Sequence, residues 1–151
     1  MLQFVICFFL LMPATTSTNP TLEDANARMA VIKQAKQLLK TKYKYGGKNP
    51  KGFDCSGFTQ YVYKSAIGIN LGGSSKAQFK QGVTVSKKNA KPGDLIFFKR
   101  SGKINHVGII TKSDNNSIFV IHSTSSKGVI IEDVRKSSYW QSKISKIKRI
   151  I

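Results

Sequence analysis

The heptapeptide Gly52-Phe53-Asp54-Cys55-Ser56-Gly57-Phe58 marks the point where an amino-terminal loop gives way to a predicted helix. It contains one of the two cysteines of the chain, and the chain has only two histidines, His106 and His122. A thiol becomes a strong nucleophile near neutral pH when an imidazole lies beside it. With one thiol in this motif and two imidazoles, the sequence allows few other assignments of these roles.

Outward from this motif, the chain divides into helices followed by strands. Apolar residues at helical spacing predict a helix over residues 22–41, and a second helix begins at Cys55 and ends near Gly68. Residues 69–93 are rich in loop formers, with a short helix around residues 75–80. This order predicts an α+β fold in which amino-terminal helices pack on an antiparallel β-sheet. The predicted strands are residues 95–98, 106–112, 118–122, 129–133 and 144–150.

Two of these strands carry the histidines. If they form a hairpin centred on residue 114, His106 lies directly opposite His122. Residues directly opposite point to the same face of a sheet, so the two imidazoles become neighbours, whereas a slip of one residue would separate them. In this register, Gly108 would leave open space beside the histidines.

The predicted position of Cys55 suits a nucleophile. Backbone N–H groups and the dipole at the start of a helix stabilise a thiolate, and Gly57 would let another segment or a substrate approach closely. His106 would take the thiol proton or hold the thiolate as an ion pair, and His122 would orient His106. Attack of Cys55 on a carbonyl carbon would give an oxyanion and then a thioester, with the Cys55 amide as the first oxyanion donor.

Five segments of the chain also carry a family resemblance. They are Tyr43–Gly47, Gly52–Tyr63, Lys91–Phe98, Asn105–Ile109 and Val120–His122. In order, spacing and residue type they resemble the NlpC-type (NlpC/p-sixty) cell-wall peptidases, and the likeness covers roughly residues 28–135. The resemblance implies a papain-like α+β fold and hydrolysis of peptidoglycan stem peptides. The usual target of that family is the bond from D-γ-glutamate to a diamino acid.

Carried over residue by residue, the resemblance implies that Cys55 is the nucleophile, His106 the base and His122 the third polar member of a catalytic triad. It also implies that the Tyr43 hydroxyl lies near the nucleophile and assists the oxyanion.

The resemblance implies substrate contacts as well. Asp54 and Ser56, which flank the nucleophile, match substrate-contacting neighbours. After the second helix, many members have an arginine, then threonine or aspartate, then serine. Here the corresponding stretch is Gly73-Ser74-Ser75, which makes Ser75 the candidate at that site and retains Gln78. It lacks an aspartate to hold a free amine, which disfavours the wall-recycling members that need one.

The amino terminus has the features of a leader. Leu2–Met12 is almost wholly apolar, about as long as the core of a signal peptide, and too short to span a bilayer comfortably. We therefore expect residues 1–20 to form a signal peptide and linker, and residues 21–151 to form a single NlpC-type catalytic domain. Export would take the protein to the periplasm, the cell wall or the extracellular space. Cys7 would leave with the leader.

The charge of the chain bears on its partners. Lysine and arginine number 25 against seven acidic residues, a formal net charge of +18. A basic surface attracts polyanions in general. For an exported protein, we expect peptidoglycan and anionic wall polymers as partners rather than a specific nucleic acid. We expect a monomer that needs no metal and no cofactor.

Several alternatives remain at this point. Cys55 could be a buried structural thiol, and the two histidines could be satisfied residues of a sheet. A cysteine with two histidines is also a zinc pattern, although no fourth protein ligand is evident. The same triad could serve an amidase, a transglutaminase-like enzyme, a thioesterase or a secreted toxin aimed at a competitor's wall. An inactive module that binds the wall or nucleic acid would use the charge alone.

Overall fold

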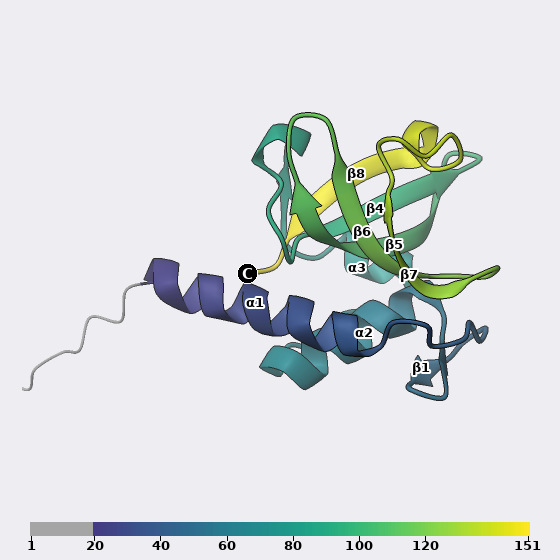
Figure 1. The fold of residues 1–151 in the computed structure, drawn as a ribbon, viewed down its shortest axis with the longest axis horizontal. Helices are drawn as coiled ribbons and strands as arrows, with labels where there is room; N and C mark the ends of the chain where they lie inside the picture. Colours follow the sequence, from purple (N-terminus) through teal and green to yellow (C-terminus); the bar gives the residue numbers. More distant parts are fainter. Residues whose placement is uncertain (1–19) are drawn as a thin grey trace, which may run out of the picture.

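The structure, a computed structural model, describes residues 20–151. Helices come first along the chain and strands second (Figure 1). The predicted leader and linker over residues 1–20 lies outside the described residues except for Pro20, where the first helix begins. The elements in order are α1 (Pro20–Gln37), β1 (Lys48–Asn49), β2 (Gly52–Phe53), α2 (Cys55–Ile67), α3 (Ser75–Phe79), β3 (Val83–Val85), η1 (Lys87–Asn89), β4 (Leu95–Arg100), β5 (Lys103–Ser113), β6 (Ile118–Thr124), β7 (Gly128–Asp133), η2 (Gln141–Lys143) and β8 (Ile144–Arg149).

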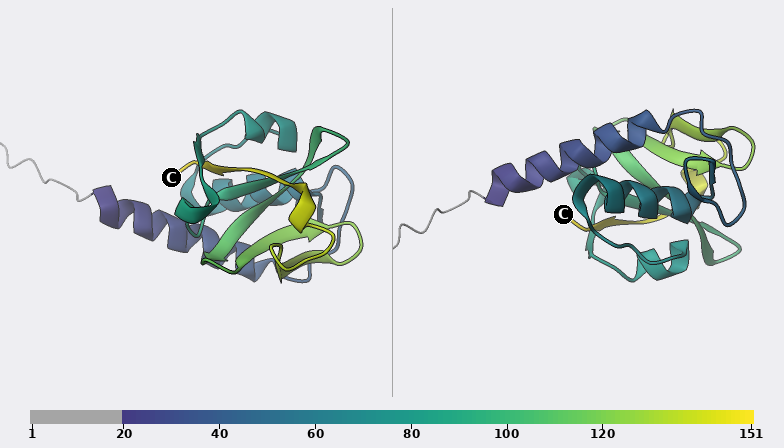
Figure 2. Two further views of the ribbon diagram at one scale, coloured as in Figure 1. Left: turned by 90° about the horizontal axis from the view of Figure 1, so that it is seen from above. Right: turned by 90° about the horizontal axis from the view of Figure 1, so that it is seen from below.

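The strands form one large sheet and one short hairpin. The large sheet has the order β3-β8-β4-β5-β6-β7, and every neighbouring pair in it is antiparallel. The helices α1 and α2 lie against one side of this sheet, as the views in Figures 1 and 2 agree. The predicted α+β class, with amino-terminal helices packed on an antiparallel sheet, is confirmed.

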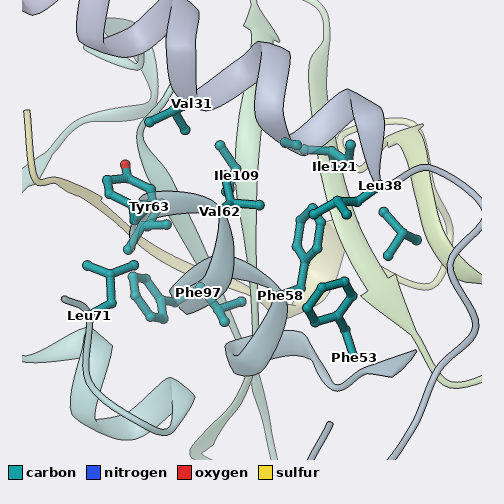
Figure 3. Close-up of a cluster of buried hydrophobic side chains, with 14 residues drawn as sticks. Val31, Leu38, Phe53, Phe58, Val62, Tyr63, Leu71, Phe97, Ile109 and Ile121 are labelled. Atoms are coloured by element: carbon teal, nitrogen blue, oxygen red, sulfur yellow. The ribbon is translucent and has the colours of Figure 1, made fainter. Parts of the chain in front are cut away.

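The main core fills the space between the helices and the sheet. It combines Val31 of α1, Leu38 just after α1, Phe58 and Val62 of α2, and inward-facing strand residues such as Ile109 (Figure 3). Burial of these side chains supplies the main force that holds the two layers together. Because α2 lies at the centre of this cluster, its first residue, Cys55, is held at a fixed place relative to the sheet.

The other face of the sheet has its own apolar cluster. Strand residues alternate between the faces, so Phe97 joins the main core while Ile96 and Phe98 join the second cluster. Trp140, in the segment before η2, packs against this second cluster. The two predicted catalytic histidines lie near this tryptophan.

The predicted helices and strands all occur, with small differences at their ends. The first helix ends at Gln37 rather than residue 41, because Lys40 adopts a left-handed φ of 68° and its amide donates to the Val129 carbonyl. The loop-rich region also contains the short strand β3, which pairs with β8 at the edge of the sheet. Among residues 20–151, no helix is both long and apolar enough to cross a membrane.

The predicted register of the histidine hairpin is wrong. Ile109 pairs with Ile121 and Ile110 with Val120, so the continuation of the ladder places Gly108, not His106, opposite His122. The turn is centred between residues 115 and 116, where Ser113 pairs with Ile118, and a bulge between Ile110 and Lys112 then shifts the register by one residue. The net shift is by two residues, so His106 and His122 still share a face, diagonally rather than directly opposite.

The expected open space at Gly108 is also absent. A Cβ atom built there would overlap Val120 Cγ1 and would lie 2.9 Å from the Cβ of His122. Gly108 therefore allows β6 and its histidine to lie close to β5, and the volume beside it is filled by protein.

A buried ion cluster joins α1 and β8 at the start of β4. Asp94, directly before β4, is fully buried and accepts hydrogen bonds from Arg28 of α1 at 3.0 Å and from Arg149 of β8 at 2.8–3.0 Å. It also accepts from the Lys91 amide. This structural role agrees with its position in a turn that leads into a strand.

Candidate active site

A glycine-lined loop fixes the start of α2. Asp54 is the N-cap residue, and its carboxylate accepts from the Gly57 amide at 2.6 Å and from the Gly46 amide at 3.1 Å. A Cβ atom at Gly57 would overlap the carbonyl oxygen of Gly47. The close approach predicted at Gly57 is therefore made by a neighbouring segment of the same chain.

Cys55, the first residue of α2, is half-buried and lines a pocket of about 590 Å³. Its Sγ atom is 3.9 Å from the carbonyl oxygen of Asn105, the residue before His106. Tyr43 and His106 line the same pocket. The fold thereby brings Cys55 from the start of α2, His106 from β5 and Tyr43 from the loop before α2 to one cavity.

The two histidines form a hydrogen-bonded pair, of which His106 lines the pocket. His106 Nε2 and His122 Nδ1 are 2.9 Å apart, and both residues are buried. His122 Nε2 lies 2.9 Å from Glu132 Oε1, which also accepts from Trp140 Nε1 at 2.8 Å. The indole of Trp140 stacks on His106, with ring centroids 4.6 Å apart and planes inclined by 24°. The side chains form a continuous row from the pocket to the carboxylate.

The electrostatics of the site favour uncharged reactants in the free protein. Burial raises the pKa of the Cys55 thiol, and hydrogen bonds from the backbone of Val107, Ser56 and Cys55 itself oppose that shift. Burial, and then the neighbouring His122, lower the pKa of His106 well below its usual range. Of the two alternatives, proton transfer to His106 and a preformed ion pair, these directions favour the first.

Tyr43 lines the same pocket as Cys55, and its role in assisting the oxyanion stays a prediction. Burial raises the pKa of its hydroxyl, and the next largest cause is the charge of a Cys55 thiolate. A phenol with a raised pKa remains a hydrogen-bond donor at neutral pH. It can therefore donate to negative charge that develops beside Cys55.

The structure does not bring every candidate residue into the pocket. Asp54 and Ser56 flank the nucleophile, but Asp54 caps the helix and Ser56 is buried, and neither lines the cavity. Ser75 is buried at the start of α3 and also lies outside the pocket lining. Gln78 Nε2 donates to the Ser56 carbonyl and so joins α3 to α2. The substrate-contacting roles of Asp54, Ser56 and Ser75 stay predictions.

The sequence reasoning missed Glu132 and gave Trp140 no role. A signal for Glu132 appears only once the register of β7 is known, because β6 and β7 pair with His122 opposite Ile130. Glu132, two residues beyond Ile130, falls on the same face as the histidine. No comparable pattern marks Trp140, which comes from an irregular segment before η2.

The predicted zinc alternative can be compared with the side-chain geometry. Across residues 20–151, no group of three or more His, Cys, Asp or Glu residues is arranged to hold a metal ion. Besides His106, Asn105 and Glu132, the polar lining of the pocket consists of hydroxyl and cationic side chains. They are Ser123, Thr124, Ser125, Ser126, Ser137, Arg100, Lys127 and Lys143.

Comparison with known proteins places this fold and site in one family. The chain is 40% identical to a protein of Bacillus subtilis named gamma-DL-glutamyl hydrolase, over 97% of this chain and 35% of that protein. It is 31% identical to the murein DD-endopeptidase MepS/murein LD-carboxypeptidase of Escherichia coli, over 85% of this chain and 65% of that protein. The chain thus spans about a third of the first relative and somewhat under two thirds of the second.

A solved structure gives the same result. The NlpC/p60 domain of the peptidoglycan hydrolase SagA superposes with a TM-score of 0.70 at 32% identity, over 81% of this chain and 97% of that one. The sequence pattern of the NlpC/P60 family matches residues 40–149, which include the nucleophile motif and both histidines. The chain belongs to the NlpC/P60 family.

Proposed function

We propose that the protein is a cysteine endopeptidase that hydrolyses amide bonds in peptidoglycan stem peptides. Family membership supports the reaction class, and the names of the relatives point to glutamyl and murein substrates. The observation that carries the proposal is the placement of Cys55 and His106 at one pocket, with His122 hydrogen-bonded behind His106.

In this proposal, His106 acts as a general base. Its Nε2 is engaged with His122, so Nδ1 is the ring nitrogen that remains to accept the Cys55 proton. Sγ attacks the carbonyl carbon, and the carbonyl oxygen becomes an oxyanion. The Cys55 amide and the Tyr43 hydroxyl are its donors.

Collapse of this intermediate breaks the C–N bond and leaves a thioester on Cys55. The proton held by His106 passes to the departing amine. A water molecule, deprotonated by the same imidazole, then attacks the thioester and releases the carboxylic acid and the free thiol. The site returns to its starting state without an external acid or base.

The bond from D-γ-glutamate to the diamino acid is the proposed target. Support comes from the 40% identity to a relative named for γ-glutamyl hydrolysis, against 31% for one named for DD-endopeptidase and LD-carboxypeptidase activities. The pocket also carries three cationic side chains, Arg100, Lys127 and Lys143. These suit a substrate with free carboxylates next to the scissile bond.

The proposal includes the location of the enzyme, which is outside the cytoplasm and at the cell wall. The apolar run Leu2–Met12 supports export, and the net charge of +18 supports retention at a wall rich in anionic polymers. Stem peptides are reached most readily by an exported enzyme, so the two parts of the proposal agree.

Mass spectrometry of the fragments released from purified peptidoglycan of known stem sequence tests the proposed bond. The expected products are a peptide ending in D-glutamate, with its γ-carboxyl free, and a fragment with a new amino group on the diamino acid. Release of intact stems from the glycan would instead identify an amidase. A full absence of cleavage by a folded protein would contradict the proposal.

A further inference from the structure

Glu132 lies at the end of the row of side chains that begins at His106 and continues through His122. Its Oε1 atom is 2.9 Å from His122 Nε2 and 2.8 Å from the indole Nε1 of Trp140. The His122 side chain is fully buried, whereas 28% of the Glu132 side chain is exposed. The carboxylate thus lies at the boundary between the buried histidine pair and the pocket, which it also lines.

From this geometry we infer that Glu132 is a positioning residue that sets the tautomers of both histidines, with Trp140 holding it in place. The inference rests on the proposed role of His106 as the base. It concerns a residue that touches neither the nucleophile nor the proposed scissile bond and that acts through His122.

The first step concerns His122. The hydrogen bond with His122 is the largest cause that lowers the pKa of Glu132, so the carboxyl group is ionised at neutral pH. An ionised carboxylate can only accept hydrogen bonds. Trp140 Nε1 can only donate, and Glu132 Oε1 accepts from it. His122 must therefore carry its proton on Nε2 to face the carboxylate, which leaves Nδ1 as an acceptor in the neutral ring.

The second step passes this constraint to His106. The acceptor Nδ1 of His122 faces Nε2 of His106 at 2.9 Å, so His106 must carry its proton on Nε2. His106 is neutral in the free protein because burial lowers its pKa. Its Nδ1 is then unprotonated and has a free lone pair. A general base needs such a nitrogen to accept the proton of the Cys55 thiol. Without Glu132, either ring could adopt the other tautomer, and His106 could present an N–H to the thiol.

Charge adds to this effect during the reaction. When His106 accepts the thiol proton it becomes a cation, and the Glu132 carboxylate lies one imidazole ring away from it. The face of Trp140, stacked on His106, also favours a cation there. The other charged groups that line the pocket, Arg100, Lys127 and Lys143, are cationic and act in the opposite direction. Glu132 is the only acidic residue among those that line the described pocket.

The architecture supports a fixed position for the carboxylate. Glu132 is on β7, whose ladder with β6 fixes it relative to His122 on the same face. Trp140 contacts Phe98 with ring centroids 4.9 Å apart, so the indole donor is itself held by the second apolar cluster. The strand ladder and the Trp140 indole together hold the Glu132 carboxylate in one place. A carboxylate in a fixed place can select one tautomer of His122, whereas a mobile carboxylate could not.

Nitrogen-15 NMR of the histidine rings tests the inference without a substrate. The chain contains only two histidines, so long-range proton–nitrogen correlations near pH 8 report both tautomers directly. In the wild type, both rings should carry the proton on Nε2. In Glu132→Ala, both should show mixed tautomers. In Glu132→Gln, the amide oxygen can still accept from Trp140 and His122, so the Nε2–H tautomers should persist.

Kinetics on a peptide substrate give the second arm. We expect Glu132→Ala to lower kcat by about 100-fold, in the range of a disabled general base, with KM changed less than about twofold. Glu132→Gln should recover most of that loss. Glu23→Gln removes one exposed carboxylate from α1, outside the pocket, and should leave both the tautomers and kcat unchanged.

Two results would overturn the inference. One is an unchanged pair of Nε2–H tautomers in folded Glu132→Ala. The other is an activity loss in Glu132→Ala that matches the loss of folded protein in a thermal melt and leaves the spectra of the folded fraction unaltered. Because the NMR arm needs no turnover, its result does not depend on which substrate the protein cleaves.

Discussion

At the scale of single residues, burial sets the chemistry of the site. The start of a helix was expected to favour the Cys55 thiolate, and hydrogen bonds from the backbone do lower the pKa of Cys55. Desolvation is the larger effect and raises it. Desolvation also lowers the pKa of His106. The free protein thus holds a neutral thiol near a neutral imidazole.

The pH dependence of thiol alkylation tests this balance. A thiol whose pKa is raised above its usual range stays mostly protonated up to pH 9, so its alkylation rate should increase about tenfold per pH unit from pH 6 to 9. The rate of iodoacetamide labelling of Cys55, followed by intact mass, measures this. A flat rate between pH 5 and 7 would indicate a preformed ion pair and would contradict the account.

At the scale of elements, the sequence predicts kinds of structure better than it predicts registers. Periodicity predicted both long helices and five strands, because the spacing of apolar residues within each segment is enough to indicate its type. The predicted pairing of β5 with β6 was wrong by two residues, because the turn is centred between residues 115 and 116, where Ser113 pairs with Ile118, and not on residue 114. The bulge at Thr111 then shifts the register by one residue, which no periodicity reveals. The histidines are still neighbours, because a shift of two preserves the face. Glu132 was missed because its role depends on the pairing of a third strand.

The contact between the Gly47 loop and the start of α2 gives an element-scale prediction. Gly57→Ala would place a methyl group where the Gly47 carbonyl oxygen lies, so the loop or the helix must move. We expect a loss of about 1–3 kcal/mol in the free energy of unfolding, measured by urea denaturation.

Gly73→Ala is the matched control for this change. The nearest atom to a Cβ built at Gly73 is the flexible Lys48 Nζ at 3.8 Å, so its stability should change by less than about 0.5 kcal/mol. Equal stability of the two variants would show that the close approach at Gly57 is not required.

At the scale of the whole molecule, Asp94 joins segments that are far apart in the chain. Its carboxylate binds Arg28 from α1 and Arg149 from β8, so the first helix and the last strand are fixed to the same point before β4. The turn Pro92-Gly93, which leads into a strand, is consistent with a structural role for Asp94. The sequence offered no way to find the two arginines, because their partnership exists only after the sheet order brings β8 beside β4.

Replacing Asp94 should therefore weaken the entire fold. Asp94→Asn leaves two partly buried guanidinium groups without a counter-charge, and we expect a loss of about 3 kcal/mol in the free energy of unfolding. Asp24→Asn, at an exposed position on α1, is the comparison and should unfold like the wild type. Thermal melts of both variants measure the difference, and a near-wild-type melting temperature for Asp94→Asn would be inconsistent with this role.

The net charge leads to a prediction about association with the wall. Attraction between a +18 protein and anionic polymers is screened as the Debye length falls from about 10 Å at 0.1 M salt to about 3 Å at 1 M. Co-sedimentation with isolated walls should therefore decrease steeply over this range. If binding to the walls did not depend on salt concentration, the net charge of the protein would not be its cause.

The most direct test of the account is the rate at which new amino groups appear when defined stem peptides are incubated with Cys55→Ala and with the wild type. We predict that kcat falls by roughly 10⁴-fold or more in a variant that melts like the wild type, because no other described side chain in the pocket can form the thioester. Cleavage by Cys55→Ala at a rate near that of the wild type would contradict the account.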